Sequence, residues 1–229
     1  DVMSLIMRFL NVWALQKFDK VYVPGNSLRA VVKKWSSRLN IEVIFNGVSK
    51  VPGVKMRKRY DLVVVSRLVS WKNIDVVIEA AIEMGLSLAI VGDGPEKEKL
   101  RKLASPNSNI VFIGNSTSEQ VLEILKQSRI FCQLSDYEGL SFSLLQAMMV
   151  GLPCVISKIV GNNDIVSRDP SAFKQIVSPR KFDLMEVLRH LISSPDEIEK
   201  LGTKAQNVAL DYFEEENSFK RVVNLLESK

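Results

Sequence analysis

Short runs of apolar and β-branched residues alternate with longer segments of helical period along most of the chain. The runs expected to be strands are Val21–Val23, Glu42–Phe45, Leu62–Val65, Ser87–Val91, Ile110–Ile113, Ile130–Gln133, Cys154–Ile156 and Gln175–Val177. Several are apolar at consecutive positions, as is typical of strands covered on both faces. The segments with helical periodicity are Asn73–Met84, Glu96–Leu103, Ser118–Lys126 and Leu144–Val150. This alternation predicts an α/β fold with a Rossmann-like, doubly wound parallel sheet.

Composition narrows the functional classes. Hydrophobic residues make up 46% of the chain and charged residues 25%, which suits a folded protein, and no apolar run reaches the roughly 18 residues of a membrane span. The net charge of +5 is compatible with an anionic ligand. Basic residues are not interleaved with aromatic ones, so no nucleic acid partner is expected. Cys132 and Cys154 lie in apolar runs and are expected to be buried in a reducing, cytoplasmic environment.

The segment from Tyr137 to Gly151 carries the main functional signal. It follows a buried strand, contains the turn residue Gly139 and then enters a helix. Open α/β sheets bind ligands at the carboxyl ends of their strands, and a helix N-terminus there offers free N–H groups to a phosphate. Glu138 would repel phosphate, but its carboxylate can accept hydrogen bonds from the hydroxyls of a sugar. The alternative is that Glu138 only caps a surface helix.

A second polar cluster, Ser66–Asn73, follows another predicted strand. Arg67 and Lys72 are expected at the same edge of the sheet as the Tyr137–Gly151 segment. Two cations opposite a helix N-terminus make a pocket for a diphosphate. For an isolated Arg and Lys, solvation at the surface is the competing interpretation. Two phosphate-binding features at one sheet edge favour the pocket.

Four segments in order resemble glycosyltransferase family 4, which has the two-domain GT-B fold. They are Ser66–Asn73, Ile90–Pro95, Asn109–Gly114 and Ser135–Pro153. The resemblance covers roughly residues 41–229 and implies a sugar transferase that uses a nucleotide-diphosphate donor, UDP- or GDP-linked. It also implies retention of anomeric configuration and chemistry without a metal or another cofactor. In this resemblance residues 41–229 are the donor-binding, C-terminal half of the GT-B fold.

The resemblance also implies roles for individual residues. Arg67 and Lys72 match the pair that holds the donor diphosphate, and Glu138 matches the carboxylate that contacts the transferred sugar; these three are the expected catalytic residues. The residues expected to bind the rest of the donor are Phe112, Ile113, Gly114, Gly139, Leu140, Ser141, Phe142 and Gln146.

Two positions depart from the family pattern. Gln146 stands where the family has a second glutamate that binds the ribose hydroxyls. Its carbonyl oxygen can still accept, but a neutral acceptor bonds less strongly than a carboxylate, by roughly 1 kcal/mol or more. Asn162-Asn163-Asp164 replaces a Gly and a Pro-Glu pair, and Asp164 is expected near the cleft.

Residues 1–40 are expected to be the tail of a preceding acceptor domain, because a lone strand–helix unit cannot form its own core. The alternative is that they extend the main sheet. An acceptor domain or partner chain is therefore expected to be missing, and residues 1–229 alone are expected to bind donor weakly and transfer no sugar.

The first helix also has an apolar stripe, formed by Met3, Ile6, Met7, Leu10 and Trp13, with Arg8 and Lys17 nearby. Such a stripe fits either packing against the acceptor domain or peripheral association with a membrane surface.

Two other functions stay open from the sequence. The first is a non-catalytic nucleotide-sugar-binding module, or one subunit of a split glycosyltransferase, which Gln146 favours. The second is a sugar-nucleotide epimerase of the same architecture, which would need acid–base groups that the sequence does not identify. The acceptor, whether glycan, lipid or protein, is not specified.

Overall fold

The computed structural model describes residues 2–51 and 56–227, and within these ranges the side chains from Met7 onward except that of Leu226. An N-terminal unit comprises α1 (Val2–Leu15), β1 (Val21–Val23), α2 (Asn26–Trp35) and β2 (Ile41–Val43). The rest of the chain contains β3 (Tyr60–Val65), α3 (Ile74–Met84), β4 (Leu88–Val91), α4 (Lys97–Ala104), β5 (Ile110–Gly114), α5 (Ser118–Lys126), β6 (Ser128–Gln133), α6 (Phe142–Met149), β7 (Cys154–Ser157), α7 (Asn163–Val166), β8 (Phe173–Ile176), α8 (Lys181–Ile192), α9 (Pro195–Tyr212) and α10 (Glu215–Glu227). Three short 3-10 turns are η1 (Ser70–Lys72), η2 (Val160–Asn162) and η3 (Pro170–Ala172). All the strands and helices expected from the sequence are present: β1 and α5 have the expected bounds, and the others have ends shifted by one or two residues. The N-cap of α5 is Thr117, which forms a reciprocal capping box with Gln120.

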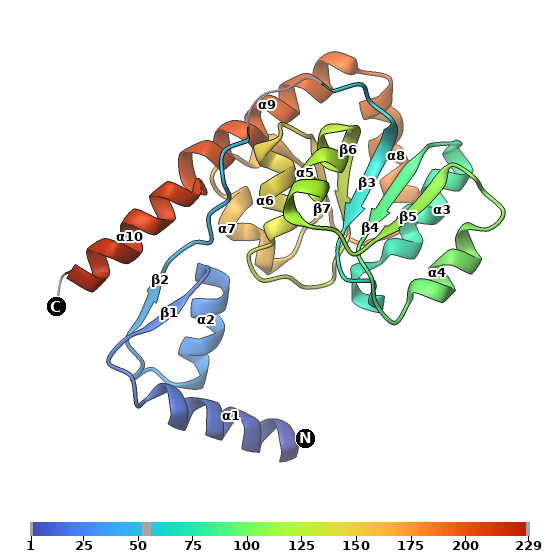
Figure 1. Cartoon of the computed structure of the whole chain (residues 1–229). Helices are drawn as coiled ribbons and strands as arrows, with labels where there is room; N and C mark the ends of the chain where they lie inside the picture. Colours follow the sequence, from blue (N-terminus) through green and yellow to red (C-terminus); the bar gives the residue numbers. More distant parts are fainter. Residues whose placement is uncertain (1, 52–55, 228–229) are drawn as a thin grey trace.

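Six parallel strands form the main sheet, in the order β5-β4-β3-β6-β7-β8 (Figure 1). The chain moves outward from β3 to β5 and then returns to add β6 on the other side of β3. This order is that of a Rossmann-like, doubly wound sheet, so the expected fold class is confirmed. The direction of winding reverses between β3 and β6. Ligands of open α/β sheets bind outside the carboxyl ends of the strands at such a reversal.

Alternate residues of the strands build two cores, one on each face of the sheet. Val63 and Phe131 pack with α5, α6 and the middle of α9 on one face. Leu62 and Ile130, their neighbours in sequence, pack with α3, α4 and α8 on the other face. All four side chains are fully buried. Because both faces are covered, the strands are apolar at consecutive positions, which is the pattern that predicted them.

The N-terminal unit lies beside the main sheet rather than within it (Figure 1). Val21 of β1 pairs with Ile41 of β2 in a separate two-stranded parallel sheet. The strand that starts at Ile41 therefore pairs with β1 of the N-terminal unit and does not join the six-stranded sheet. Because β1 lies outside the main sheet, its backbone N–H and C=O groups need another strand as partner, and β2 provides it.

The segment that follows β2 is joined by hydrogen bonds and a ring contact to the segment between α9 and α10. Val48 donates to the carbonyl of Phe213 (2.8 Å), and its own carbonyl accepts from Glu215 (3.1 Å). Phe45 meets the ring of Phe213 edge-on at 5.5 Å between centroids. Within the described residues, none of the helices combines the length and apolar character needed to cross a membrane.

Candidate functional site

An open cleft of about 810 Å³ lies at the carboxyl ends of β3, β4 and β6. It coincides with the reversal of winding between β3 and β6, where doubly wound sheets bind their ligands. The residues that line it are Val65, Ser66, Arg67, Val91, Gly92, Asp93, Gly94, Asn115, Ser116, Val121, Glu138, Leu140, Ser141, Phe142, Ser143 and Gln146. Arg67 from one side of the switch point and Glu138 from the other therefore share one cleft, as expected from the sequence.

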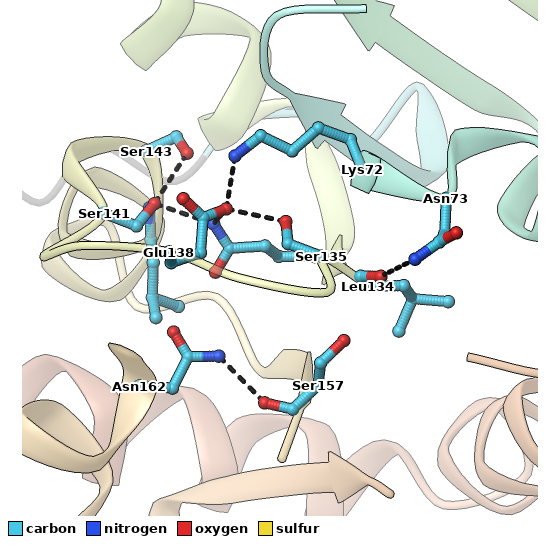
Figure 2. A network of polar contacts seen from close by, with 11 residues as sticks. Lys72, Asn73, Leu134, Ser135, Glu138, Ser141, Ser143, Ser157 and Asn162 are labelled. Atoms are coloured by element: carbon cyan, nitrogen blue, oxygen red, sulfur yellow. Dashed lines mark hydrogen bonds and ion pairs between the residues drawn. The ribbon is translucent and has the colours of Figure 1, made fainter. Parts of the chain in front are cut away.

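Glu138 is the centre of a polar network in the loop after β6 (Figure 2). Its Oε1 accepts from Ser135 Oγ (2.6 Å) and from Gln133 Nε2 (3.0 Å), and it forms an ion pair with Lys72. Within the described part of the chain, the second oxygen, Oε2, has no hydrogen bond. The donors fix the carboxylate through one oxygen and leave the other as an acceptor for a ligand hydroxyl.

The N-terminus of α6 opens into the same cleft. Ser141 is its N-cap, is buried, and accepts a hydrogen bond from Leu144 N (3.3 Å) through Oγ. The first turn of a helix has N–H groups without intrahelical partners and carries the positive end of the helix dipole. Phe142 and Ser143, in that first turn, line the cleft. This end of α6 can therefore hold an anion.

The loop after β3 contributes the two cations in different ways. Arg67 is exposed and lines the cleft. Lys72 ends the 3-10 turn η1 and reaches across to Glu138, with only 15% of its side chain exposed. Asn73 takes a left-handed backbone conformation, and its Nδ2 donates to Leu134 O (2.8 Å) and to Asp136 Oδ1 (2.7 Å). The loops after β3 and β6 are thus joined directly.

The Gly92-Asp93-Gly94 turn after β4 packs so closely on the Arg67 loop that neither glycine has room for a Cβ. A Cβ at Gly92 would lie 2.0 Å from Ser66 O, and one at Gly94 would lie 2.3 Å from Leu68 O. Gly92 also has φ 125°, a conformation that favours glycine. The backbone of this turn therefore supports the loop that carries Arg67.

Comparison with known proteins identifies the family. The family model described as "Glycosyl transferases group 1" matches residues 49–208, more than half of the chain. The chain belongs to the glycosyl transferases group 1 family. The matched region contains the whole cleft described above.

Individual relatives agree with this assignment. An uncharacterized glycosyltransferase of Methanocaldococcus jannaschii is 30% identical over 156 residues, which cover 59% of this chain and 40% of the relative. The GtfA subunit of a UDP-N-acetylglucosamine–peptide N-acetylglucosaminyltransferase of Streptococcus agalactiae is 27% identical over 139 residues, 56% of this chain and 28% of the relative. A sucrose-phosphate synthase structure from Thermosynechococcus elongatus has the same fold, with a TM-score of 0.84 at 17% identity, covering 96% of this chain and 61% of that one. The chain thus spans less than half of these two relatives in sequence.

The residues predicted to bind the rest of the donor lie in different places in this member of the group 1 family. Leu140, Ser141, Phe142 and Gln146 line the cleft, and Gln146 Nε2 donates to Ser118 Oγ (3.0 Å). Because Nε2 is engaged by Ser118, the amide oxygen of Gln146 is the atom left to accept from a ligand. Gly139 is exposed in the turn next to Glu138.

Phe112, Ile113 and Gly114 lie at the end of β5, outside the main cleft. Phe112 packs against the α3–α4–α8 core. The guanidinium carbon of Arg101 lies over the Phe112 ring, 5.8 Å from the ring centre. Ile113 lines a neighbouring hollow with Asn115 and Ser116. Asn115 and Ser116 line the cleft as well, so the two hollows adjoin.

Sequence reasoning missed Gln133 and Ser135, which hold Glu138. Gln133 is a polar residue at the end of an otherwise buried apolar strand, and that contrast is a signal the sequence does carry. Only the fold shows that its amide reaches residues 138 and 141.

Asp164 lies at the boundary with the N-terminal unit. Its carboxylate accepts from Asn26 Nδ2 (2.8 Å) and from Ser27 N (2.9 Å) at the start of α2. In the adjacent turn, a Cβ at Gly161 would lie 2.0 Å from Glu138 O. The contact to the N-terminal unit is therefore one short segment away from the Glu138 loop.

The two cysteines are both free and buried. Burial raises the pKa of the Cys132 thiol to about 12, and it also raises the pKa of Cys154. Both thiols are therefore protonated and act as small apolar side chains.

Proposed function

We propose that the cleft binds a nucleotide-diphosphate sugar and that the chain is the donor-binding part of a metal-independent, retaining glycosyltransferase of family 4. The observation that carries this proposal is the meeting of Arg67, Glu138 and the α6 N-terminus at the switch point of the sheet. A cation and a helix N-terminus suit a diphosphate, and a carboxylate suits sugar hydroxyls.

In this proposal Arg67 and the first-turn amides of α6 hold the diphosphate. Their positive charge stabilises the negative charge that develops on the leaving nucleotide when the bond to the sugar breaks. Lys72, from the same loop as Arg67, is paired with Glu138 and adds a second cation. These protein cations supply the charge stabilisation that a metal ion supplies in other transferases.

Glu138 orients the transferred sugar through its open oxygen Oε2. Gln146 accepts from the ribose through its amide oxygen, and Ser118 keeps that amide in place. The base lies toward the end of β5, near Phe112, Ile113 and Gly114. UDP is the favoured nucleotide because the Streptococcus agalactiae relative is named for UDP-N-acetylglucosamine.

The N-terminal unit is proposed to be the end of an acceptor domain. A two-stranded parallel sheet is too small for independent stability, and α1 exposes Met7, Phe9, Leu10 and Trp13. Further strands and helices of an acceptor domain would cover these surfaces. Met3 and Ile6, also predicted to be part of the stripe, lie outside the described side chains. We expect residues 1–229 alone to bind donor weakly and transfer no sugar; measurable turnover would contradict this.

A split enzyme is the second candidate, because the Streptococcus agalactiae relative is itself named as a subunit. In that case a separate chain supplies the acceptor site. Adding a purified acceptor-domain chain would then restore transfer to residues 1–229.

Peripheral association with the cytoplasmic face of a membrane is the remaining proposal for α1. Exposed Trp13 and Phe9, together with Arg8 and Lys17, are the kinds of side chain that bind anionic lipid surfaces. Flotation with phosphatidylglycerol vesicles, comparing the chain with a W13S/F9S double variant, tests it. Equal flotation of the two proteins assigns the stripe to the acceptor domain.

A thermal-shift screen against UDP-, GDP- and ADP-sugars tests the proposed function. We expect one class of nucleotide sugar to raise the melting temperature in a concentration-dependent manner. The absence of any shift with all three classes would rule out the donor site.

A further inference from the structure

Gln133, the last residue of β6, is a buried polar side chain with two partners in the site. Its Nε2 donates to Glu138 Oε1 (3.0 Å) and to Ser141 Oγ (2.7 Å). An ionised carboxylate can only accept, so Glu138 dictates which end of the amide faces it. One amide therefore ties the carboxylate of Glu138 to the N-cap of α6.

The other end of the same amide is unpaired. Gln133 Oε1 and Ser66 Oγ are both buried and have no hydrogen-bond partner within the described residues. Both residues line one small cavity, together with Lys72 and Ser135. The cavity offers about 10 Å³ to the centre of a water molecule, which is about what one water requires. Two buried acceptors around a space of that size form the pattern of a bridging water.

We propose that Gln133 is a positioning residue for Glu138, and that Gln133 Oε1 and Ser66 Oγ hold one buried water in the floor of the cleft. The water lets Gln133 satisfy its carbonyl while both N–H bonds stay committed to the site. Its bond to Ser66 connects the end of β3, and hence the Arg67 loop, to the end of β6. The effect of Gln133 on sugar binding through Glu138 rests on the proposed function, whereas the water does not.

A purely space-filling role for Gln133 is disfavoured by the neighbouring strand residues. Ile130, Phe131 and Cys132 fill the interior with apolar atoms and leave no oxygen unpaired. An apolar residue at position 133 would fill the same space, but neither Glu138 Oε1 nor Ser141 Oγ would receive its amide bond. A buried amide oxygen without a hydrogen-bond partner destabilises the fold, so an amide at this position needs the water. Its benefit lies in the bonds that it donates to Glu138 and Ser141.

The first experiment measures how much tighter UDP-N-acetylglucosamine binds than UDP, by calorimetry on the full chain. Q133L removes both donors at similar volume, and Q133E replaces them with a second carboxylate 3.0 Å from Glu138. We expect Q133L to leave UDP affinity within about twofold and to reduce the preference for the sugar nucleotide about tenfold. Q133E should reduce the preference further.

Q206L is the matched control, since Gln206 Nε2 donates to Met149 O (2.8 Å) outside the cleft. It should leave both affinities unchanged. If Q133L and Q206L behave alike while wild type prefers the sugar nucleotide, Gln133 does not position Glu138. If wild type binds neither ligand, the donor site itself fails, and the structural test below still decides the water and the geometry.

The second experiment is a crystal structure of the unliganded chain at about 1.6 Å or better, with Q133L and S66A beside the wild type. We expect a water within hydrogen-bond distance of both Gln133 Oε1 and Ser66 Oγ in the wild type. It should be lost in S66A, and the Glu138 carboxylate should turn away from Ser135 in Q133L. A wild-type map without that water, or an unmoved Glu138 in Q133L, overturns the corresponding half of the proposal.

Discussion

Two carboxylates at opposite ends of the same strands are held in contrasting ways. At the amino ends of β3, β4 and β6, Asp61 accepts from Ser87 N (3.0 Å) and Oγ (2.7 Å) through one oxygen and from Arg129 (3.2 Å) through the other. At the carboxyl ends, Glu138 receives all its donors on one oxygen. Both carboxylate oxygens of Asp61 thus have partners within the protein, whereas Glu138 has one paired oxygen and one that is open to a ligand.

The difference shows how a sheet separates stability from function. A carboxylate with both oxygens paired contributes to folding and has little capacity for a ligand. A carboxylate fixed through one oxygen at the mouth of a cleft is preorganised for binding. We therefore expect substitutions at the Asp61 end to change stability and substitutions at the Glu138 end to change binding.

The largest effect is expected from R67A, at the Glu138 end. Arg67 is exposed, so its loss should change the free energy of unfolding by less than about 0.5 kcal/mol. Charged hydrogen bonds to phosphate contribute about 1.5–3 kcal/mol, so UDP affinity should fall roughly 10- to 100-fold in calorimetry. R189A, which removes an exposed arginine from α8, is the control and should bind UDP normally.

The next effect is expected at the other end, from D61A. Removing this carboxylate leaves the Ser87 hydroxyl and the Arg129 guanidinium without their partner, at a cost of about 2 kcal/mol in urea unfolding. UDP affinity should not change. D183A removes a surface carboxylate that pairs with Arg180 and should cost far less. A loss of UDP binding in D61A would contradict the separation of the two ends.

E138Q tests the same separation from the binding side. Gln keeps the shape of Glu138 but loses the charge, so the preference for UDP-N-acetylglucosamine over UDP should fall about tenfold. The free energy of unfolding should change by less than in D61A. The neutral amide avoids the cost of burying a charged carboxylate, and this offsets the loss of the ion pair with Lys72. Equal destabilisation in the two variants would mean that Glu138 is also mainly structural.

A pH series sharpens the contrast. Burial opposes ionisation of Asp61, but hydrogen bonds from Ser87 and the Arg129 guanidinium outweigh it and lower the pKa of Asp61 below its ordinary 3.8. The stability this provides is fully present above pH 3.8 and is lost as the pH falls through the folded-state pKa. The difference in unfolding free energy between wild type and D61A should therefore shrink as the pH falls from 5 to 2.5. A constant difference would show that Asp61 acts through packing alone.

The smallest effect is expected from Q146E. A carboxylate at position 146 accepts from ribose hydroxyls more strongly than an amide, so affinity for UDP should rise about fivefold. It also gives up the donor that Gln146 offers to Ser118. S118A in the wild-type background measures that second contribution separately. Weaker UDP binding by Q146E than by S118A would show that the amide suits a different donor.

The sequence was sufficient for the architecture because both cores follow from local pattern. Consecutive apolar residues such as Leu62 and Val63 in β3 already imply a strand covered on both sides. The same pattern, with Arg67 and Glu138 after their strands, placed the two residues at one edge of the sheet. The features that the sequence could predict are therefore those that depend only on the position of a residue along its strand.

The rest depended on contacts between distant segments. The ion pair of Lys72 with Glu138 joins residues that the sequence had assigned to diphosphate and sugar separately. The pairing of β1 with β2 was not predicted, because strand register cannot be read from either strand alone. Gln133 became significant only when its amide was placed against Glu138 and Ser141.

The most direct test of the account is a crystal structure of the chain soaked with UDP. We expect the diphosphate between Arg67 and the first turn of α6, with the ribose within hydrogen-bond distance of Gln146. A diphosphate bound elsewhere on the molecule would contradict this expectation. So would an empty cleft in crystals soaked at a UDP concentration that saturates the protein in solution.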